Sequence, residues 1–165
     1  MEPEILEITE ARPDSYPVAE GVPEWIWQRI EAYCSQRWTP RTAMWVVCGD
    51  GCFRPTLTPA VITKVEEYER GTMVWQERPI TNEARDVPLT RFTATVGADN
   101  PVPAVVIEAA KLLAEYIADT ANRAGLRSMG SGELQLTYTR DRRAMAQAIQ
   151  LSGAADLLRP YRRPR

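Results

Sequence analysis

An alanine-rich segment over residues 103–124 is the feature that most constrains the fold of this chain. Its apolar residues recur every three or four positions, as they do on one side of a helix. The stripe consists of Val106, Ala109, Ala110, Leu113, Ile117 and Ala121. Pro103 opens the segment and Gly125 follows it as a C-terminal cap. Because alanines let a neighbouring backbone approach closely, we expect a central helix.

Two shorter amphipathic helices are predicted on either side of the long one. The first covers residues 23–37, since Pro23 fits a first helical turn and Pro40 ends the run. Its apolar positions are Trp25, Ile26, Ile30, Tyr33 and Cys34. Trp27 lies off this stripe, so we expect it to be exposed in the monomer and to form a subunit interface. The second covers residues 141–151, before Gly153.

The section over residues 43–96 is rich in β-branched and aromatic residues and in turns. The turn Gly49-Asp50-Gly51 predicts a hairpin, and a second hairpin is expected around Glu69-Arg70-Gly71. The predicted strands are 43–47, a segment at 53, 61–68, 72–76 and 89–96. Together they predict a small antiparallel sheet.

Charge is distributed unevenly along the 165 residues, although the net charge is only −2. Residues 1–20 carry six acidic residues and one arginine, which predicts an extended acidic arm. Residues 140–165 carry seven arginines and two acidic residues. The opposite ends could pair between neighbouring copies, or both could be solvated tails.

The last segment, residues 152–165, combines an apolar pair with a basic tail. Leu157 and Leu158 offer area worth about 1.5–3 kcal/mol per fully buried side chain. Pro160 and Pro164 prevent a regular helix beyond them. This pattern predicts a hook that inserts into another polypeptide.

Several kinds of chemistry are excluded or disfavoured by composition. The chain contains no histidine, so Ser-His-Asp and Cys-His machinery cannot be assembled. Cys34, Cys48 and Cys52 are too few for a zinc site of four Cys or His ligands. We therefore expect no metal, no cofactor and no enzymatic activity.

The carboxylates Glu66, Glu67 and Glu69 form the strongest acid–base candidate in the chain. Their side chains alternate along a strand, and no sequence pattern indicates a pocket, so a solvated strand edge is the favoured interpretation. A small enzyme that uses carboxylates alone stays an alternative.

The location of the protein is predicted from two further features of the sequence. No apolar run approaches the ~20 residues of a membrane span. The first residues lack the pattern of a secretory signal, which predicts a cytoplasm-like compartment with reduced thiols.

The chain resembles the head-to-tail connector, or adaptor, proteins of tailed double-stranded DNA bacteriophages and gene transfer agents. The resemblance depends on short segments that occur in order over most of the chain. They are Ile30-Glu31-Ala32-Tyr33 with Arg37-Trp38-Thr39-Pro40-Arg41-Thr42, Pro59-Ala60-Val61-Ile62, Pro103-Ala104-Val105, and Ser152-Gly153-Ala154 through Leu157-Leu158-Arg159-Pro160-Tyr161-Arg162-Arg163.

This resemblance implies a fold and a set of partners. The fold class would be α+β, with a helical body over residues 21–151, a small antiparallel sheet, an N-terminal arm and a C-terminal tail. A homo-oligomeric ring, typically of twelve copies, would lie beneath the portal protein in the virion neck after assembly in the host cytoplasm. A stopper or tail-proximal protein would dock on its far side, and genomic DNA would pass through it without sequence-specific binding.

The resemblance also implies which residues bind the portal. They are Leu157, Leu158, Arg159, Pro160, Tyr161, Arg162 and Arg163. The alternative from a different class is a small DNA-binding regulatory module that uses the arginines between Arg140 and Arg165. A pI near 5.4 disfavours that alternative, since strong phosphate binding needs a basic face.

Overall fold

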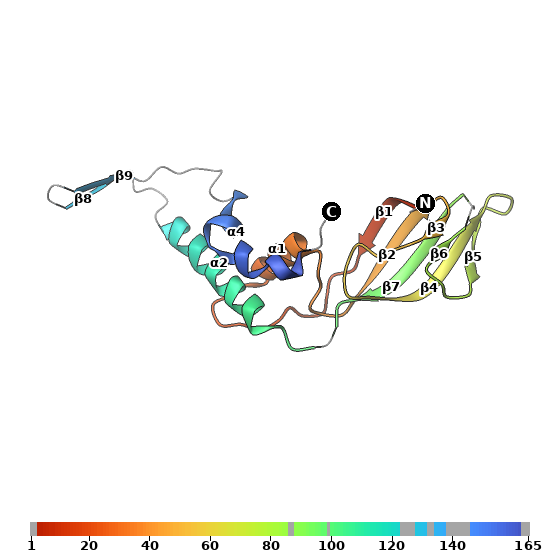
Figure 1. The fold of residues 1–165 in the computed structure, drawn as a ribbon, viewed down its shortest axis with the longest axis horizontal. Helices are drawn as coiled ribbons and strands as arrows, with labels where there is room; N and C mark the ends of the chain where they lie inside the picture. Colours follow the sequence, from red (N-terminus) through yellow and green to blue (C-terminus); the bar gives the residue numbers. More distant parts are fainter. Residues whose placement is uncertain are drawn as a thin grey trace. The chain divides into compact units, whose positions relative to one another are not determined.

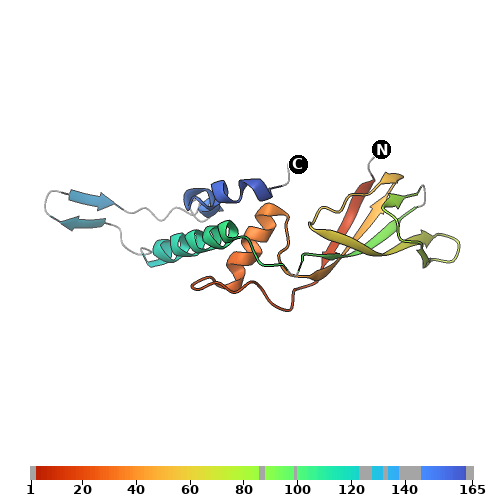
Figure 2. The same ribbon diagram turned by 60° about the horizontal axis from the view of Figure 1, so that its bottom comes forward.

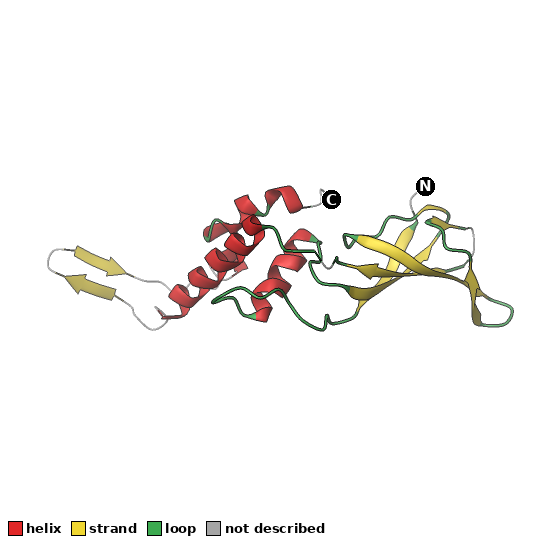
Figure 3. Ribbon diagram, turned by 90° about the horizontal axis from the view of Figure 1, so that it is seen from below, coloured by secondary structure: helices red, strands yellow, loops and turns green. Residues whose placement is uncertain are grey.

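A computed structural model describes residues 3–85, 88–98, 100–122, 128–131, 134–137 and 146–162. The chain forms two compact units, each assembled from two separate stretches of sequence. Unit 1 comprises Met1–Tyr16 and Ser35–Asn100, and unit 2 comprises Pro17–Cys34 and Pro101–Arg165. Strands β1 to β7 belong to unit 1, whereas the helices and strands β8 and β9 belong to unit 2 (Figure 1 and Figure 3). The polypeptide therefore passes between the units three times.

Unit 1 is built on a five-stranded antiparallel sheet with the order β1-β2-β7-β4-β5 (Figure 1). The strands are β1 (Glu4–Glu10), β2 (Arg41–Cys48), β7 (Thr90–Val96), β4 (Ala60–Glu69) and β5 (Val74–Arg78). The short strands β3 (Gly51–Cys52) and β6 (Glu83–Ala84) pair with each other as a separate ribbon. β1 and β5 are thus the two edges of the larger sheet.

The inner face of this sheet carries the apolar core of unit 1. Every second residue from Ala43 along β2 and from Phe92 along β7 is buried, as expected for strands with one covered face. Phe53, from the loop after β3, covers this face and stacks on Phe92 at a ring-centroid distance of 4.4 Å. The ring centres of Trp45 and Phe53 are 5.8 Å apart. The indole Nε1 of Trp45 donates a hydrogen bond to Thr56 Oγ1 at 3.0 Å. The loop over residues 53–57 therefore closes the core.

The predicted fold class, a helical body with a small sheet, is wrong. The largest element is the five-stranded sheet, and α2, with 19 residues, is the one long helix among the described residues. The prediction failed because it treated the acidic N-terminus as unfolded and limited the sheet to the middle of the chain.

The predicted acidic arm is wrong over Glu4–Glu10, because this segment pairs with β2 as strand β1. Its composition suggested too little apolar area to fold. In the structure Ile5 packs against the core, and Glu10 is held by two arginines. These contacts with residues distant in the sequence hold the strand in the sheet.

The two predicted hairpins have different outcomes. The one around Gly49-Asp50-Gly51 is wrong, since β2 pairs with β1 and β7, and the chain after the turn crosses the inner face of the sheet at Phe53. The second is confirmed, because β4 pairs with β5 in antiparallel register. The predicted strand over 89–96 is also confirmed, as β7.

A carboxylate between two arginines joins β1 to the segment that leads into β2. Arg37 donates two hydrogen bonds to the Glu10 carboxylate, from Nε to Oε1 and from Nη2 to Oε2, the second at 2.7 Å. Arg41 Nη1 donates to Glu10 Oε1 at 3.1 Å, and Arg41 Nη2 donates to Thr39 Oγ1 at 2.8 Å. The Arg41 guanidinium also lies 5.5 Å from the ring centre of Tyr16. We call Glu10, Arg37 and Arg41 the arginine clamp.

The arginine clamp alters the pKa of its carboxylate. Burial alone would raise the pKa of Glu10, but the hydrogen bonds and charges of Arg37 and Arg41 outweigh burial and lower it below the ordinary value of 4.5. A carboxylate whose pKa is lower in the folded state stabilises the fold above its unfolded pKa. That contribution is lost as pH falls through the folded pKa. The clamp therefore weakens below about pH 4.5.

Unit 2 is helical, with α2 as its longest element (Figure 2). It contains α1 (Glu24–Cys34), α2 (Ala104–Asn122), β8 (Ser128–Ser131), β9 (Leu134–Thr137), α4 (Ala148–Leu151), α5 (Ala154–Leu157) and the 3-10 helix η1 (Arg159–Tyr161). Helices α1, α4 and α5 pack against α2. The buried side of α2 follows the predicted stripe at Val106, Ala109, Ala110, Leu113 and Ile117.

The C-terminal end of the first predicted helix differs from the observed one. α1 stops at Cys34 instead of residue 37, because Ser35 adopts a left-handed conformation with φ of 55°. Residues 123–124 of the predicted long helix and 141–145 of the predicted C-terminal helix lie outside the described residues. Among the described residues, no helix has the length and apolarity of a membrane span.

Replacing Glu10 by Gln is expected to lower the free energy of unfolding by about 2 kcal/mol at pH 7, because the substitution removes the negative charge that contacts two nearly buried arginines. Glu7→Gln on the same strand is the control, because its side chain is exposed, and should change stability by less than about 0.5 kcal/mol. Urea unfolding measures both values. The difference in unfolding free energy between the wild type and Glu10→Gln should become smaller below pH 4.5. Equal stability of this variant and the wild type at pH 7 contradicts the role of the clamp.

Candidate functional site

The C-terminal segment folds onto its own unit. Leu158, at the end of α5, is fully buried, and α5 packs against α2. The prediction that Leu158 inserts into another polypeptide is therefore wrong for this side chain. Gly153, with φ of 79°, turns the backbone between α4 and α5. This turn lets the apolar side chain of Leu158 be buried within its own chain.

The other predicted portal-binding residues lie at the surface of unit 2. Arg159, Pro160 and Arg162 are exposed, and Leu157 and Tyr161 are half-buried. Arg163 lies outside the described residues. Leu158 therefore holds in place a short segment whose neighbouring side chains are accessible.

Arg162 fastens the end of this segment to α1. Its Nη1 donates to the Tyr33 hydroxyl at 3.2 Å, and its guanidinium lies 4.7 Å from the Tyr33 ring centre. A guanidinium over an aromatic ring gains about 0.5–1 kcal/mol at an exposed site. Burial raises the pKa of the nearby Cys34 thiol to about 11, although the Arg162 charge partly offsets this. Cys34 is thus a neutral core residue at neutral pH.

The exposure of the two tryptophans in α1 is the reverse of the prediction. Trp27 is 1% exposed, whereas Trp25 is 46% exposed, so the prediction that Trp27 is exposed is wrong. The buried side of the helix consists of Ile26, Trp27, Ile30, Glu31 and Cys34. One residue step turns an α-helix by about 100°, and the predicted stripe was placed one step too early. Trp25 is the accessible tryptophan of this helix.

The outer face of the sheet in unit 1 presents an ordered cluster of charged and aromatic side chains. Arg91 Nε contacts Glu66 Oε2 at 2.8 Å, and Lys64 Nζ contacts Glu66 Oε1 at 2.9 Å. The Arg91 guanidinium also lies 4.3 Å from the ring centre of Trp75, whose ring is 5.3 Å from that of Tyr68. These five residues, from β4, β5 and β7, hold one another in defined positions, with Glu66 buried and the other four half-buried.

The carboxylates considered for acid–base chemistry are held as ion pairs. The hydrogen bond from Arg91 lowers the pKa of Glu66 against the opposing effect of burial. Glu67 lies on the opposite face of β4 and contacts Arg78 at 2.8 Å and Arg85 at 3.8 Å. Both are 7% exposed, so the prediction of a solvated strand edge is wrong for these two residues, whereas Glu69 is exposed as predicted. A general acid needs a raised pKa, and that of Glu66 is lowered.

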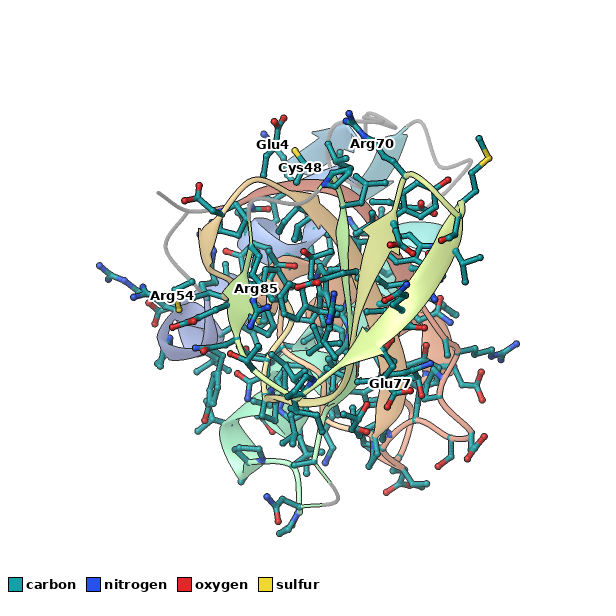
Figure 4. All side chains as sticks on the ribbon, turned by 90° about the vertical axis from the view of Figure 1, so that its right-hand side faces the viewer. Glu4, Cys48, Arg54, Arg70, Glu77 and Arg85 are labelled. Atoms are coloured by element: carbon teal, nitrogen blue, oxygen red, sulfur yellow. The ribbon has the colours of Figure 1, made fainter. Side chains whose placement is uncertain are left out.

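The three cysteines occupy different environments. Cys34 is buried, Cys48 is half-buried and Cys52 is exposed, and all three thiols are free. Cys48 Sγ lies 3.9 Å from Glu4 Oε2, and Figure 4 shows the two side chains next to each other. Within the described part of the chain, no three His, Cys, Asp or Glu side chains gather as a metal site would require.

Neither the arginine clamp nor the cluster around Arg91 was predicted from the sequence. Glu10 is 27 residues from Arg37 and 31 from Arg41, so no local pattern joins them. The register of β4 and β7 places Glu66 opposite Arg91, and this becomes visible only once strands separated by about 25 residues are paired. Comparisons with protein-family models, curated proteins and solved structures give no match for this chain.

Trp27→Ala is expected to lower the free energy of unfolding by about 3–5 kcal/mol, because it removes a fully buried indole from unit 2. Trp25→Ala, two residues away on the same helix, is the matched control and should cost less than about 1 kcal/mol. Thermal unfolding followed by circular dichroism measures both. A larger loss of stability for Trp25→Ala than for Trp27→Ala would contradict the observed burial of Trp27 and exposure of Trp25.

Proposed function

We propose that this chain is a non-enzymatic subunit of the head-to-tail connector of a tailed double-stranded DNA bacteriophage or gene transfer agent. The subunits form a ring, typically of twelve copies, beneath the portal protein. The ring extends the DNA channel and offers a docking surface to a stopper or tail-proximal protein. The order of the short segments that resemble connector proteins supports this proposal.

Exposed apolar side chains on the sheet of unit 1 are the observation that carries the proposal. Single exposed apolar residues are normal at protein surfaces. Here they lie on three strands and one turn of the same sheet and occur at both of its edges, namely Leu6 and Ile8 on β1, Val61 on β4, Met73 in the β4–β5 turn and Val74 on β5. Exposed apolar residues along sheet edges are typical of surfaces that contact other proteins. They favour an assembly protein.

Unit 2 adds a second accessible apolar set. Among the side chains of this unit whose exposure the structure describes, the exposed large apolar ones are Val18, Trp25, Val105 and Leu151. Exposed tryptophans are enriched among the residues that dominate interface energies. Trp25 therefore replaces Trp27 as the proposed subunit-interface residue.

The C-terminal segment provides the proposed portal contact through its surface rather than as a free hook. Leu158 fixes the segment to α2, and the accessible side chains are Leu157, Arg159, Pro160, Tyr161 and Arg162. Arginine and tyrosine are frequent anchors of protein interfaces, and the arginines can pair with portal carboxylates.

The net charge of −2 agrees with a channel protein through which DNA slides. A basic wall would retain the phosphates through counterion release. The DNA-binding alternative depends on arginines of the C-terminal region, and one of them, Arg162, is engaged by Tyr33. The connector proposal does not need these arginines to contact DNA.

Co-purification with the portal protein tests this function. The double change Arg159→Ala and Tyr161→Ala is expected to leave the monomer folded and to weaken portal binding about tenfold or more, because each side chain lies at the surface. Leu158→Ala is the contrasting variant and should destabilise the monomer by about 2–5 kcal/mol.

Two results would contradict the proposal in different ways. Unchanged portal binding by the double variant removes the C-terminal segment from the contact. Failure of the wild-type chain to bind a portal protein, together with salt-sensitive binding of duplex DNA, favours the regulatory module instead.

A further inference from the structure

The sheet of unit 1 ends in two strands that have a neighbour on only one side. β1 and β5 are separated by β2, β7 and β4, and each is terminal in the described chain. The outer side of such a strand presents backbone N–H and C=O groups that can pair with another strand. Both edges also carry exposed apolar residues, with exposed fractions of 54% for Leu6, 48% for Ile8, 77% for Met73 and 54% for Val74.

The two edge strands run in the same direction. Four successive antiparallel pairings connect them, from β1 through β2, β7 and β4 to β5. When a second copy continues the sheet after a rotation about a ring axis, its β1 lies parallel to the β5 of the first copy. This contact uses two different surfaces of each subunit, and such heterologous contacts form a ring when the rotation closes.

Charge favours the pairing of β5 with β1 over the pairing of β1 with itself. The only charged residues of β1 are glutamates, so two β1 strands would bring like charges together. Arg70 lies in the turn before β5, and Glu4 lies at the start of β1. Figure 4 shows Arg70 and Glu4 toward the same end of unit 1. Parallel pairing therefore brings Arg70 of one copy near Glu4 of the next.

The regularly paired part of β1 is nearly as long as β5. β1 contains a bulge between Ile5 and Glu7, after which the pairing is regular from Glu7 to Glu10. β5 has five residues, Val74–Arg78. The bulge and the charges of β1 disfavour its pairing with most other strands. A strand that pairs with β1 must therefore have complementary charges.

We propose that the β5 edge of each subunit pairs in parallel with the β1 edge of the next copy, so that the sheet continues around the ring. This inference depends on the proposed ring function and assigns the surfaces that build the ring. Arg70 and Glu4 form an opposite-charge pair across the contact, and Leu6 and Val74 are covered there.

Disulfide cross-linking of the full-length protein tests the pairing. The background carries Cys34→Ala, Cys48→Ser and Cys52→Ser, and Val74→Cys is combined with Leu6→Cys or, for a register shifted by two residues, with Ile8→Cys. After mild oxidation, a double-cysteine chain should give a ladder of covalent dimers, trimers and higher multimers on a denaturing gel. An equal mixture of the two single-cysteine chains should give dimers only.

Geometry excludes the main artefact of this experiment. The four inter-strand spacings between β1 and β5 amount to about 19 Å. A disulfide needs Cα atoms within about 7 Å, so the two positions cannot be joined within one subunit.

The outcomes separate this inference from the proposed function. Rings in electron micrographs without a ladder from either cysteine pair overturn the edge pairing and leave the connector function standing. Strong dimers from Leu6→Cys alone or from Val74→Cys alone indicate like-to-like edges and also overturn it. The Arg70→Glu variant should assemble less than the wild type, and the double change Arg70→Glu with Glu4→Arg should restore assembly. No effect of Arg70→Glu on assembly overturns the charge pairing.

Discussion

The contact of Glu10 with Arg37 and Arg41 is the constraint on which unit 1 depends. The N-terminal strand has three glutamates among its seven residues, and Ile5 is the one apolar residue of the strand that packs against the core, so packing alone gives it little stability. Bidentate contact with Arg37 gives this strand a specific partner, and Arg41 adds a second. β1 forms one edge of the sheet. By holding β1 in place, the arginine clamp also determines which strand is exposed at that edge.

At several places near the surface, side chains are held in position by contacts with their neighbours. On the outer face of the sheet, Arg91, Glu66 and Trp75 hold one another in position. On unit 2, Leu158 and Arg162 hold the C-terminal segment against α2 and α1. A partner that docks on such surfaces meets side chains that have already lost much of their freedom, which reduces the entropy cost of binding.

Local periodicity predicted part of this structure, and its limits have physical causes. The stripe of α2 and the β4–β5 hairpin depend on neighbouring residues and were found. The phase of α1 was not, because Trp25 and Trp27 are both large and apolar, and tertiary packing decides which of them faces α2. The arginine clamp was missed because its partners are 27 and 31 residues apart. The burial of Leu158 likewise follows from long-range packing against α2.

The threefold passage of the chain between the units has a consequence for biosynthesis. The last strand of unit 1 ends at Val96, so a ribosome releases everything this unit needs well before the chain is finished. Helix α1 is translated early, but α2, against which it packs, begins about 70 residues after α1 ends. During that interval Ile26, Trp27 and Ile30 have no core to enter. Nascent chains are therefore expected to carry a finished sheet and an uncovered helix α1 until α2 is made, which is the stage at which chaperones would engage them.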